Sequence, residues 1–327
     1  MVVETADGRA QARLEYEAPD HACGVDRFRL EFALLYLARA AGAEVSEGAT
    51  VRQVHLGQDR AGLLVSQDGA PTWWKARLVI GADGPLSIVA RAAGAAVANR
   101  RFRRAALTGH RLDAAAAPPT TPMEARMIVG RGWYLGLAPV PGARVNLGLV
   151  IGEGELRALL ASGSGLDQIV DAKLSSIDGP ACAWSSAHAT DEIQAHLPLA
   201  HRVTRSAGSR WLLVGDAAGF IDPLSGEGLH RALVSAELAA ATVARWAVGD
   251  RLALADYDRR LRARFRGKDV VSWLLQLFLL QPHLARHALA RLERRDRPRR
   301  TLARGLADLL PASALLDPRF HLRVLAP

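Results

Sequence analysis

Two acidic residues stand where a short apolar segment ends, and each could take part in binding or chemistry. Asp83 follows the apolar segment 78–80, and Asp216 follows the apolar segment 211–214, each with a flanking glycine. The pattern predicts a buried strand, then a turn, then a helix, so each carboxylate should lie at the carboxyl end of a strand beside free helix N–H groups. Such a position suits the hydroxyls and phosphates of a ligand.

The second acidic residue is followed by a run of small residues and a long alanine-rich segment. Residues 222–228 read DPLSGEG and lead into a helix expected over 227–248. Small residues let the backbone approach a flat ring closely, and the positive end of the helix dipole favours an anion. A single turn of this kind is common as a plain strand-to-helix connection, whereas the two together, in this order, are more specific.

These residues give the chain a resemblance to a flavoprotein group that contains the geranylgeranyl reductases and the class A, aromatic-hydroxylase-type monooxygenases. The resemblance rests on the two acidic turns, on Ser87 and Arg91, on segment 214–228 and on the Val-Asp-Arg at 25–27, and it extends over nearly the whole chain. It implies an α/β (α+β) fold with a glutathione-reductase-like, Rossmann-type FAD-binding domain, an antiparallel β substrate domain and a C-terminal helical region.

The resemblance also implies where FAD would bind. The first turn would lie along the nucleotide side, the second against the ribitol, and residues 226–228 beneath the flavin pyrimidine, where a helix N-terminus stabilises the anionic reduced ring. Arg27 would lie near the pyrophosphate. The implied FAD-binding residues are Arg27, Gly81, Asp83, Gly84, Gly215, Asp216, Ala217, Pro223, Gly226, Glu227 and Gly228. No catalytic residue is identified.

The glycine fingerprint G-x-G-x-x-G, which folds of this kind need after their first strand, is not found in the sequence. The G-x-G pairs at 130–132, 152–154, 163–165 and 226–228 all lack the third glycine at the required spacing. We therefore expect an N-terminally truncated FAD-binding domain, the result of a start codon assigned too late. An incomplete parallel sheet would leave apolar edges uncovered.

The pattern of elements divides the chain into four parts. They are a partial FAD-binding domain, a β substrate domain, a return to the FAD-binding domain and a helical C-terminal region, expected at 1–100, 101–200, 201–250 and 251–327. The first part should contain a helix over 27–41, and the second should contain four β-like runs within 104–151 and a helix over 155–170. The helix at 227–248 should bury an apolar stripe formed by Leu229, Ala232, Leu233, Ala236, Ala240 and Val243.

The substrate domain departs from one family pattern. Geranylgeranyl reductases tend to carry Y-x-W-x-F-P in this sheet, whereas residues 134–139 read YLGLAP, so two large rings are replaced by glycine and alanine. A prenyl chain is therefore in doubt as the substrate, and an enlarged apolar cavity could take another bulky molecule. Trp133, Tyr134 and Gly136 are the candidate substrate contacts, and for the two aromatic residues plain sheet packing is an equal alternative.

Composition limits the other classes of function. The net charge is +9 and the pI about 10.4, which would suit nucleic acid or an anionic membrane. Only three of the 42 basic residues are lysines, however, and the basic stretches lack interleaved aromatic residues, so no nucleic-acid partner is expected. No apolar run approaches the roughly 18 residues of a membrane span, which leaves at most peripheral contact. Cys23 and Cys182 suggest no disulfide framework, so a cytoplasmic location is expected, and no metal site is predicted.

Taken together, these features predict an FAD-dependent oxidoreductase that acts on a bulky, hydrophobic small molecule with NAD(P)H as electron donor. The flavin would either reduce a double bond of the substrate or hydroxylate it, and the sequence does not decide between them. The alternatives are a monooxygenase or halogenase-type enzyme instead of a reductase, or a truncated remnant that no longer binds FAD. The sequence leaves the substrate and the oligomeric state undetermined.

Overall fold

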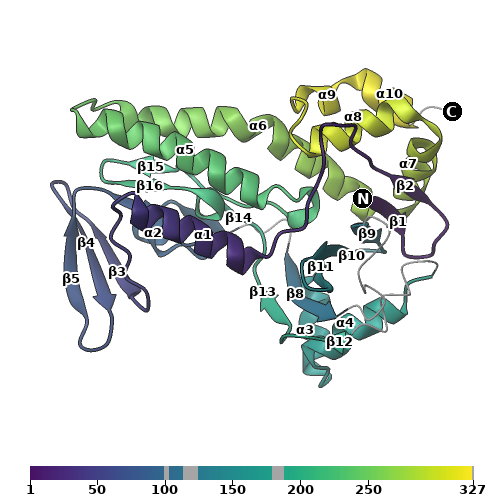
Figure 1. Cartoon of the computed structure of the whole chain (residues 1–327), viewed down its shortest axis with the longest axis horizontal. Helices are drawn as coiled ribbons and strands as arrows, with labels where there is room; N and C mark the ends of the chain where they lie inside the picture. The colour runs from purple at the N-terminus through teal and green to yellow at the C-terminus, as the bar shows by residue number, and fades with distance from the viewer. Residues whose placement is uncertain (99–102, 113–123, 179–187, 326–327) are drawn as a thin grey trace. The chain divides into compact units, whose positions relative to one another are not determined.

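The structure is a computed structural model that describes residues 1–98, 103–112, 124–178 and 188–325 (Figure 1). The chain forms two compact units. Unit 1 comprises Met1–Glu31, Arg103–Leu199 and Val270–Pro327, and unit 2 comprises Phe32–Phe102 and Ala200–Asp269. Two helices, α1 (Arg27–Ala40) and α6 (Ala253–Leu280), run from one unit into the other.

Unit 1 is built on an eight-stranded sheet. Its strands lie in the order β12-β8-β11-β10-β9-β1-β2, and β13 also pairs with β8. The pairs are antiparallel except for β1 and β9, which run parallel. The strands are β1 (Val2–Thr5), β2 (Gln11–Arg13), β8 (Arg104–Leu112), β9 (Arg126–Val129), β10 (Tyr134–Val140), β11 (Arg144–Gly152), β12 (His188–Ala189) and β13 (Gln194–His196).

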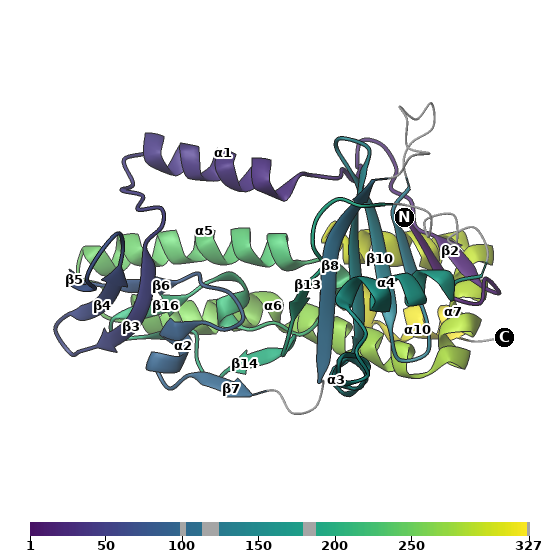
Figure 2. The ribbon, with the colours of Figure 1, turned by 90° about the horizontal axis from the view of Figure 1, so that it is seen from below.

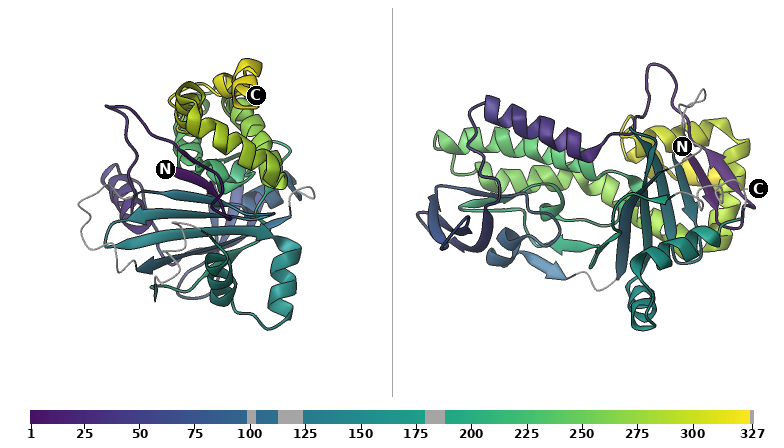
Figure 3. Two further views of the ribbon diagram at one scale, coloured as in Figure 1. Left: turned by 90° about the vertical axis from the view of Figure 1, so that its right-hand side faces the viewer. Right: turned by 60° about the horizontal axis from the view of Figure 1, so that its bottom comes forward.

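Strict alternation of side chains gives this sheet two different faces. Leu107, Leu135 and Leu149 lie on one face, where they are fully buried in a cluster with Leu156 and Leu174. The last two residues come from α3 (Glu153–Ala161) and α4 (Leu166–Ser175). Figure 3 shows these helices on one side of the sheet and the C-terminal helices on the other.

The C-terminal helices pack against the β1–β2 end of the sheet. A second buried cluster joins Ala12 of β2 to Leu289 and Val324. The helices that follow α6 are α7 (Pro282–Arg294), α8 (Asp296–Leu306), α9 (Ser313–Leu316) and α10 (Pro318–Leu325).

Unit 2 contains three small sheets and the helices that pack on them. The first sheet joins β15 (Ala207–Gly208), β16 (Trp211–Leu213) and β6 (Val79–Gly81), the second joins β14 (His201–Val203) and β7 (Ala96–Ala98), and the third joins β3 (Thr50–Leu56), β4 (Ala61–Ser66) and β5 (Thr72–Ala76). The short helix α2 (Ile88–Ala92) follows β6. Figure 2 shows α5 (Gly228–Ala247) and α6 running alongside β6 and β16.

A buried tyrosine of α6 fixes the end of β16. Tyr257 is 1% exposed, and its hydroxyl donates a hydrogen bond of 2.6 Å to the carbonyl of Leu213, the last residue of the strand. Burial raises the pKa of Tyr257, so the phenol keeps the proton that it donates. Leu212 and Val214 share a buried cluster with this ring, so the strand is held from its side chains and from its backbone.

Several expected elements are found, and some differ. The four β-like runs correspond to β8, β9, β10 and β11, and the first helix corresponds to α1. The single helix expected over 155–170 is instead two helices, α3 and α4, because the chain turns between them at Gly163, whose φ is +91°.

The units also divide the chain differently from the four expected parts. Residues 1–31 belong to unit 1 and not to unit 2, because β1 pairs with β9 over 126–129. The part expected to end at residue 250 extends to residue 269, because the first turns of α6 pack on β16, where the Tyr257 hydroxyl bonds the carbonyl of Leu213. Both differences come from contacts between residues far apart in sequence.

The expectation that α5 buries its apolar stripe is wrong. Leu229 and Leu233 are 39% and 56% exposed, and the buried face instead carries Ser235, Ala239 and Thr242. The reason is a close backbone contact: the Ser235 hydroxyl accepts a 2.7 Å hydrogen bond from the N–H of Gly215. Small side chains on this face let the helix approach the turn after β16, where larger ones would hold it away.

His201 connects β14 to that same turn. Its backbone pairs with Phe220 in both directions, at 3.0 and 3.2 Å, and its ring lies against the backbone of Asp216 and Ala217. Neither ring nitrogen reaches hydrogen-bond geometry with a described residue. Burial lowers the pKa of His201 below its ordinary value, and the backbone of Asp216 and Ala217 only partly opposes this effect.

This histidine should make the stability of the chain depend on pH. Because its folded pKa is lowered, the unfolded chain binds the proton more tightly, so the contribution is fully present above the unfolded pKa of about 6.5 and is lost as the pH falls below it. We expect wild type to lose more unfolding free energy between pH 7.5 and 5.5 than His201→Gln does, measured by urea denaturation at each pH. His55→Gln removes an exposed imidazole from β3 and should follow wild type. Parallel curves for wild type and His201→Gln would contradict the assignment.

Candidate functional site

The two acidic turns follow the two parallel strands of one small mixed sheet. Strands β6 and β16 run parallel, with Gly81 opposite Leu213, and the N–H of Val214 donates to the carbonyl of Gly81 at 3.0 Å. Asp83 follows the end of one strand and Asp216 the end of the other. The carboxyl edge of a parallel sheet is where open α/β folds bind their ligands. The structure therefore brings together the two turns that the sequence singled out.

Gly81 is required by this close pairing. A Cβ atom at residue 81 would lie 2.8 Å from Cβ of Val89 and 2.9 Å from Cδ2 of Leu213. Both distances are shorter than real Cβ contacts, and both neighbours are buried. The glycine lets α2, β6 and β16 pack together, so at this position its role is to hold the two turns in place.

The first turn is held by its own acidic side chain. Asp83 is exposed, and its Oδ2 accepts a 2.7 Å hydrogen bond from the N–H of Ile88 at the start of α2. Ser87 caps the same helix through a 3.0 Å bond from the N–H of Ala90. Gly84 has a φ of +73°, a conformation that suits glycine. Asp83 therefore shapes the turn and still presents its carboxylate to solvent.

The second turn is a short 3₁₀ helix packed under α5. This helix spans Gly215–Ala218, and Asp216 within it is half-buried. Gly215 has a φ of +55°, and a Cβ there would lie 3.4 Å from Cβ of Ala232 on α5. Ala217 is fully buried, whereas the acidic residue beside it reaches the surface. The turn thus packs between α5 and β14, and Asp216 within it remains partly accessible.

The loop between this turn and α5 ends in a tight approach to the helix N-terminus. Asp222 accepts a 3.0 Å hydrogen bond from the N–H of Leu224 and so begins a second 3₁₀ helix, Pro223–Ser225. Gly226 follows with a φ of +69°. Hydrogen bonding within α5 then starts with the N–H of Arg231, which donates to the carbonyl of Glu227 at 2.9 Å. The N–H groups of the first turn before it have no carbonyl partner within the helix.

A buried ion pair lies directly at this N-terminus. Glu227 and Lys268 of α6 have side chains only 7% and 3% exposed, and Oε1 of the carboxylate lies 3.2 Å from Nζ of the lysine. Burying either charge alone would be unfavourable, so each stabilises the other. The sequence singled out Glu227 through its neighbouring glycines, but it gave no signal for Lys268, which stands 41 positions further along the chain.

Arg27 is not brought to the acidic turns by the contacts that define either unit. It belongs to unit 1, whereas both turns belong to unit 2. Its side chain is 63% exposed and forms an ion pair with Glu31 one helical turn later. An exposed pair of this kind contributes little to stability, and the role near the pyrophosphate stays a prediction.

The substrate candidates of unit 1 separate into packed and open positions. Trp133 is 7% exposed within the cluster that faces α3 and α4, and the Lys173 ammonium lies 5.3 Å from its ring centre. Tyr134 is also buried, at 2%. These positions favour the sheet-packing alternative for both aromatic residues. Gly136 pairs with Gly148. A Cβ added at Gly148 would meet no atom within 4 Å, whereas one added at Gly136 would lie 3.6 Å from Cε of Met127, an ordinary contact distance.

Two other features of the described residues bear on the kind of site. No group of three or more His, Cys, Asp or Glu side chains is arranged to hold a metal ion in this part of the chain. Among the helices that the structure describes, none is both long enough and apolar enough to cross a membrane. Cys23 is an exposed free thiol, and Cys182 lies outside the described residues.

Relatives with named activities match about two thirds of the chain. Menaquinone reductase of Mycobacterium tuberculosis is 29% identical over 238 residues, which are 68% of this chain and 54% of that protein. Menaquinone reductase of Mycolicibacterium smegmatis is 27% identical over 247 residues, which are 71% of this chain and 56% of that protein. The chain thus spans about half the length of the curated relatives it matches.

Solved structures share the fold at low sequence identity. The flavin-dependent halogenase CmlS has a TM-score of 0.70 at 24% identity, covering 81% of this chain and 50% of that one. The flavin-dependent brominase Bmp2 has a TM-score of 0.73 at 16% identity, covering 99% and 76%. The anhydrotetracycline hydroxylase OxyS from Streptomyces rimosus has a TM-score of 0.64 at 19% identity, covering 87% and 56%.

The sequence pattern of one family extends over most of the chain. It is the pattern of the FAD binding domain, it matches residues 2–266, and it includes both acidic turns and the loop that leads into α5. The matched region takes in all of unit 2 except its last residues. The chain therefore belongs to the FAD binding domain family.

Proposed function

We propose that this chain is the FAD-binding part of an FAD-dependent oxidoreductase that acts on a bulky, apolar small molecule. The observation that carries the proposal is the parallel pairing of β6 with β16, which sets two acidic turns side by side at the edge of one sheet. The family match supports FAD as the ligand of that edge.

The residues present at this edge fit a flavin nucleotide. A Cβ atom added at Gly84, Gly226 or Gly228 would meet no atom within 4 Å, so the backbone there faces open space that a ligand can approach. The half-buried carboxylate of Asp216 is a suitable acceptor for ribitol hydroxyls. The first-turn N–H groups of α5 are suitable donors to a carbonyl or to an anionic ring.

Each part of the edge then has a distinct task. Asp83 and Gly84 would hold the nucleotide side, Asp216 would bind the ribitol, and the amides at 226–228 would face the pyrimidine oxygen. FAD, when bound, supplies two-electron chemistry that the side chains of the protein lack. The chain itself contributes orientation and positive potential, with NAD(P)H as the proposed electron donor.

For the reaction, we propose reduction of a double bond in a quinone-like or other apolar substrate. The support is that the curated relatives are menaquinone reductases. The open position at Gly148, which pairs with Gly136, gives room for a bulky group on one face of the unit 1 sheet. Hydroxylation or halogenation is the competing outcome, and the finer likeness to geranylgeranyl reductases stays a prediction, as do a cytoplasmic location and peripheral contact with a membrane.

We further propose that a strand and helix bearing the glycine fingerprint pack against unit 2. Its helices carry apolar side chains that no described residue covers: Phe32 and Tyr36 of α1 are 60% and 65% exposed, and Leu233 of α5 is 56% exposed. Ile80 of β6 is 45% exposed, and β6 is the last strand of its sheet. Large exposed apolar surfaces of this kind usually mark an interface.

Binding of FAD should depend on Asp216. A hydrogen bond to a charged acceptor contributes about 1.5–3 kcal/mol, so Asp216→Asn should weaken FAD binding about tenfold to a hundredfold, measured by absorbance and fluorescence titration of the purified full chain. Asp250→Asn is the matched control, because Asp250 is an acidic residue of unit 2 paired with Arg245 on an exposed surface. A purified wild-type chain that is colourless and takes up no FAD would favour the remnant alternative.

The products should separate reduction from oxygenation. With FAD, NADPH and a menaquinone that carries a polyprenyl side chain, we expect turnover without oxygen. After the extract is reoxidised in air, so that any quinol returns to quinone, the product should still be heavier by two hydrogens, detected by mass spectrometry. A product heavier by one oxygen atom, formed only in air, would instead make the enzyme a monooxygenase. Asp216→Asn provides the control that any product requires the bound cofactor.

The two charges of the buried pair at the N-terminus of α5 should shift the reduction potential of bound FAD in opposite directions. Lys268→Met leaves the Glu227 carboxylate uncompensated and should lower the potential, whereas Glu227→Gln leaves the ammonium and should raise it. Each shift should be on the order of 30 mV, which for a two-electron couple corresponds to about 1.4 kcal/mol.

The double variant, Glu227→Gln with Lys268→Met, removes both charges and should return the potential close to wild type. The double variant separates the effect of charge from the effect of packing, because a change in potential that came from altered packing would remain in it. Potentials are measured by dye equilibration. Shifts of the same sign in both single variants would contradict the proposed position of the flavin ring.

A further inference from the structure

An open area on the sheet of unit 1 carries a histidine that the proposed flavin site does not use. Leu107 and Leu149 point toward α3 and α4. Thr108, His110 and Gly148 alternate with them along β8 and β11 and therefore lie on the opposite face. All three are partly accessible, and a Cβ atom added at Gly148 would meet no atom within 4 Å. The described residues thus leave this part of the sheet open.

Asp191 fixes the position of His110 from the edge of the sheet. It lies between β12 and β13, the two short strands that pair with β8, at a point where neither continues. Its Oδ1 accepts a 2.6 Å hydrogen bond from the N–H of His110, and its Oδ2 lies 2.8 Å from Nδ1 of the histidine ring. One carboxylate thus holds both the backbone and the ring of the same residue, which sets the orientation of the imidazole.

This pairing determines which ring nitrogen is left for another molecule. Burial acts to raise the pKa of Asp191, but the hydrogen bonds from the ring and the N–H of His110 outweigh it, and the pKa lies below its ordinary value. An ionised carboxylate can only accept, so Nδ1 carries a proton and donates it. Nε2 then faces outward from the pair, and it forms no hydrogen bond with a residue that the structure describes.

The other polar side chains of this face that lie near the histidine already have partners. Arg144 of β11 forms an ion pair with Asp26. Thr108 Oγ1 lies 3.3 Å from Nε2 of His196 on β13. Within the described part of the chain, Nε2 of His110 differs from these groups because its pairing with the carboxylate uses only the other nitrogen of the ring.

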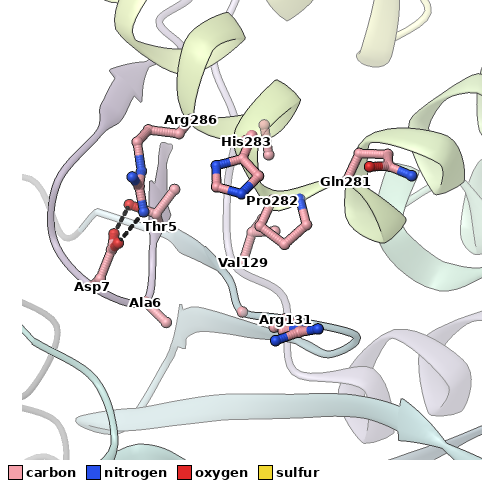
Figure 4. Close-up of a pocket in the computed structure, with 11 residues that line it drawn as sticks. Thr5, Ala6, Asp7, Val129, Arg131, Gln281, Pro282, His283 and Arg286 are labelled. Carbon is pink, nitrogen blue, oxygen red and sulfur yellow. Dashed lines mark hydrogen bonds and ion pairs between the residues drawn. The ribbon is translucent and has the colours of Figure 1, made fainter.

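The same face continues from this rim to a cavity under α7. Gly148 pairs with Gly136 in the middle of the sheet, and Val129 of the next strand lines a cavity of about 570 Å³ (Figure 4). Figure 4 shows Asp7 and Arg286 at its wall directed at each other, and they form an ion pair. These two charges satisfy each other, so neither needs a ligand. The cavity adds room for an apolar group at the far end of the face.

We propose that His110, oriented by Asp191, binds a ring oxygen of the substrate, with the ring lying over Gly136 and Gly148. The inference rests on the proposed function, because it assigns an anchor to the substrate of that reaction. A neutral imidazole accepts from a hydroxyl at Nε2, and a protonated one donates to a carbonyl, so the pair suits a quinol and a quinone alike. The two glycines let a flat ring lie close to the backbone. The substrate class is thereby narrowed to flat rings that carry a hydroxyl or a carbonyl.

Binding of a ring in the absence of cofactor tests this anchor separately from the flavin chemistry. The probes are 1-naphthol and naphthalene, which has the same rings without the oxygen, measured by equilibrium dialysis with the full chain at about pH 8, where imidazole is mostly unprotonated. We expect wild type to bind naphthol about fivefold to tenfold more tightly than naphthalene. His110→Leu should remove this preference. His55→Leu makes the same change at an exposed position of unit 2 and should keep it.

Two further variants separate orientation from space. Asp191→Asn should also reduce the preference, because the amide NH2 opposite Nδ1 would move the ring proton to Nε2, which then no longer accepts from the hydroxyl. Gly148→Val places its side chain in open space, so it should weaken binding of both probes about fivefold and leave the preference unchanged. Thermal melting shows that each variant is folded. Should His110→Leu fail to fold, Asp191→Asn decides in its place.

Equal binding of the two probes by wild type, no binding of either, or an unchanged preference in folded His110→Leu would overturn the inference. With FAD and NADPH, His110→Leu should raise the KM for a menaquinone about fivefold to tenfold and leave FAD binding unchanged. A wild type that prefers naphthol but takes up no FAD would refute the proposed function and support the anchor. A wild type that reduces menaquinone but binds both probes equally would refute the anchor alone.

Discussion

The parallel pairing of β6 with β16 is the constraint on which the candidate FAD site depends. A parallel pair brings the carboxyl ends of both strands to one edge, and here the bond from Val214 to Gly81 sets the two ends within a residue of each other. An antiparallel pairing of the same strands would send the two acidic turns to opposite edges. The register thus places both carboxylates at one edge before any ligand is considered.

Small residues around the second turn follow from the same constraint. The turn must end at the sheet edge and still pass under α5, so Gly215 and Ala232 approach each other closely: a Cβ atom at residue 215 would lie 3.4 Å from Cβ of Ala232. Ser235 then satisfies the N–H of Gly215, and Tyr257 satisfies the carbonyl of Leu213. Backbone groups that the turn would otherwise leave unpaired are therefore bonded to side chains of two helices, which makes the turn rigid before a ligand arrives.

The local features of the site could be predicted from the sequence, because a strand, a glycine and an acidic residue are encoded next to one another. What could not be predicted depends on pairing over long distances. Val2 pairs with Arg126 and draws the N-terminal residues into the sheet of unit 1, and Lys268 reaches Glu227 from a different helix. The buried face of α5 could not be predicted for the same reason. Hydrophobic periodicity indicates an apolar stripe, whereas the turn that packs beneath the helix favours small residues such as Ser235.

Alternation along the strands of unit 1 assigns its candidate residues to two roles. Ile128, Leu135 and Leu149 point toward α3 and α4 and form the core, so the residues between them point the other way. By this register Gly136 and Gly148 share the second face with Val129, and the parallel partner of Val129 is Thr5. Both Val129 and Thr5 line the cavity under α7. The glycine pair and the cavity therefore lie on one continuous face of one sheet, and the large aromatic Trp133 stabilises that sheet from the opposite side.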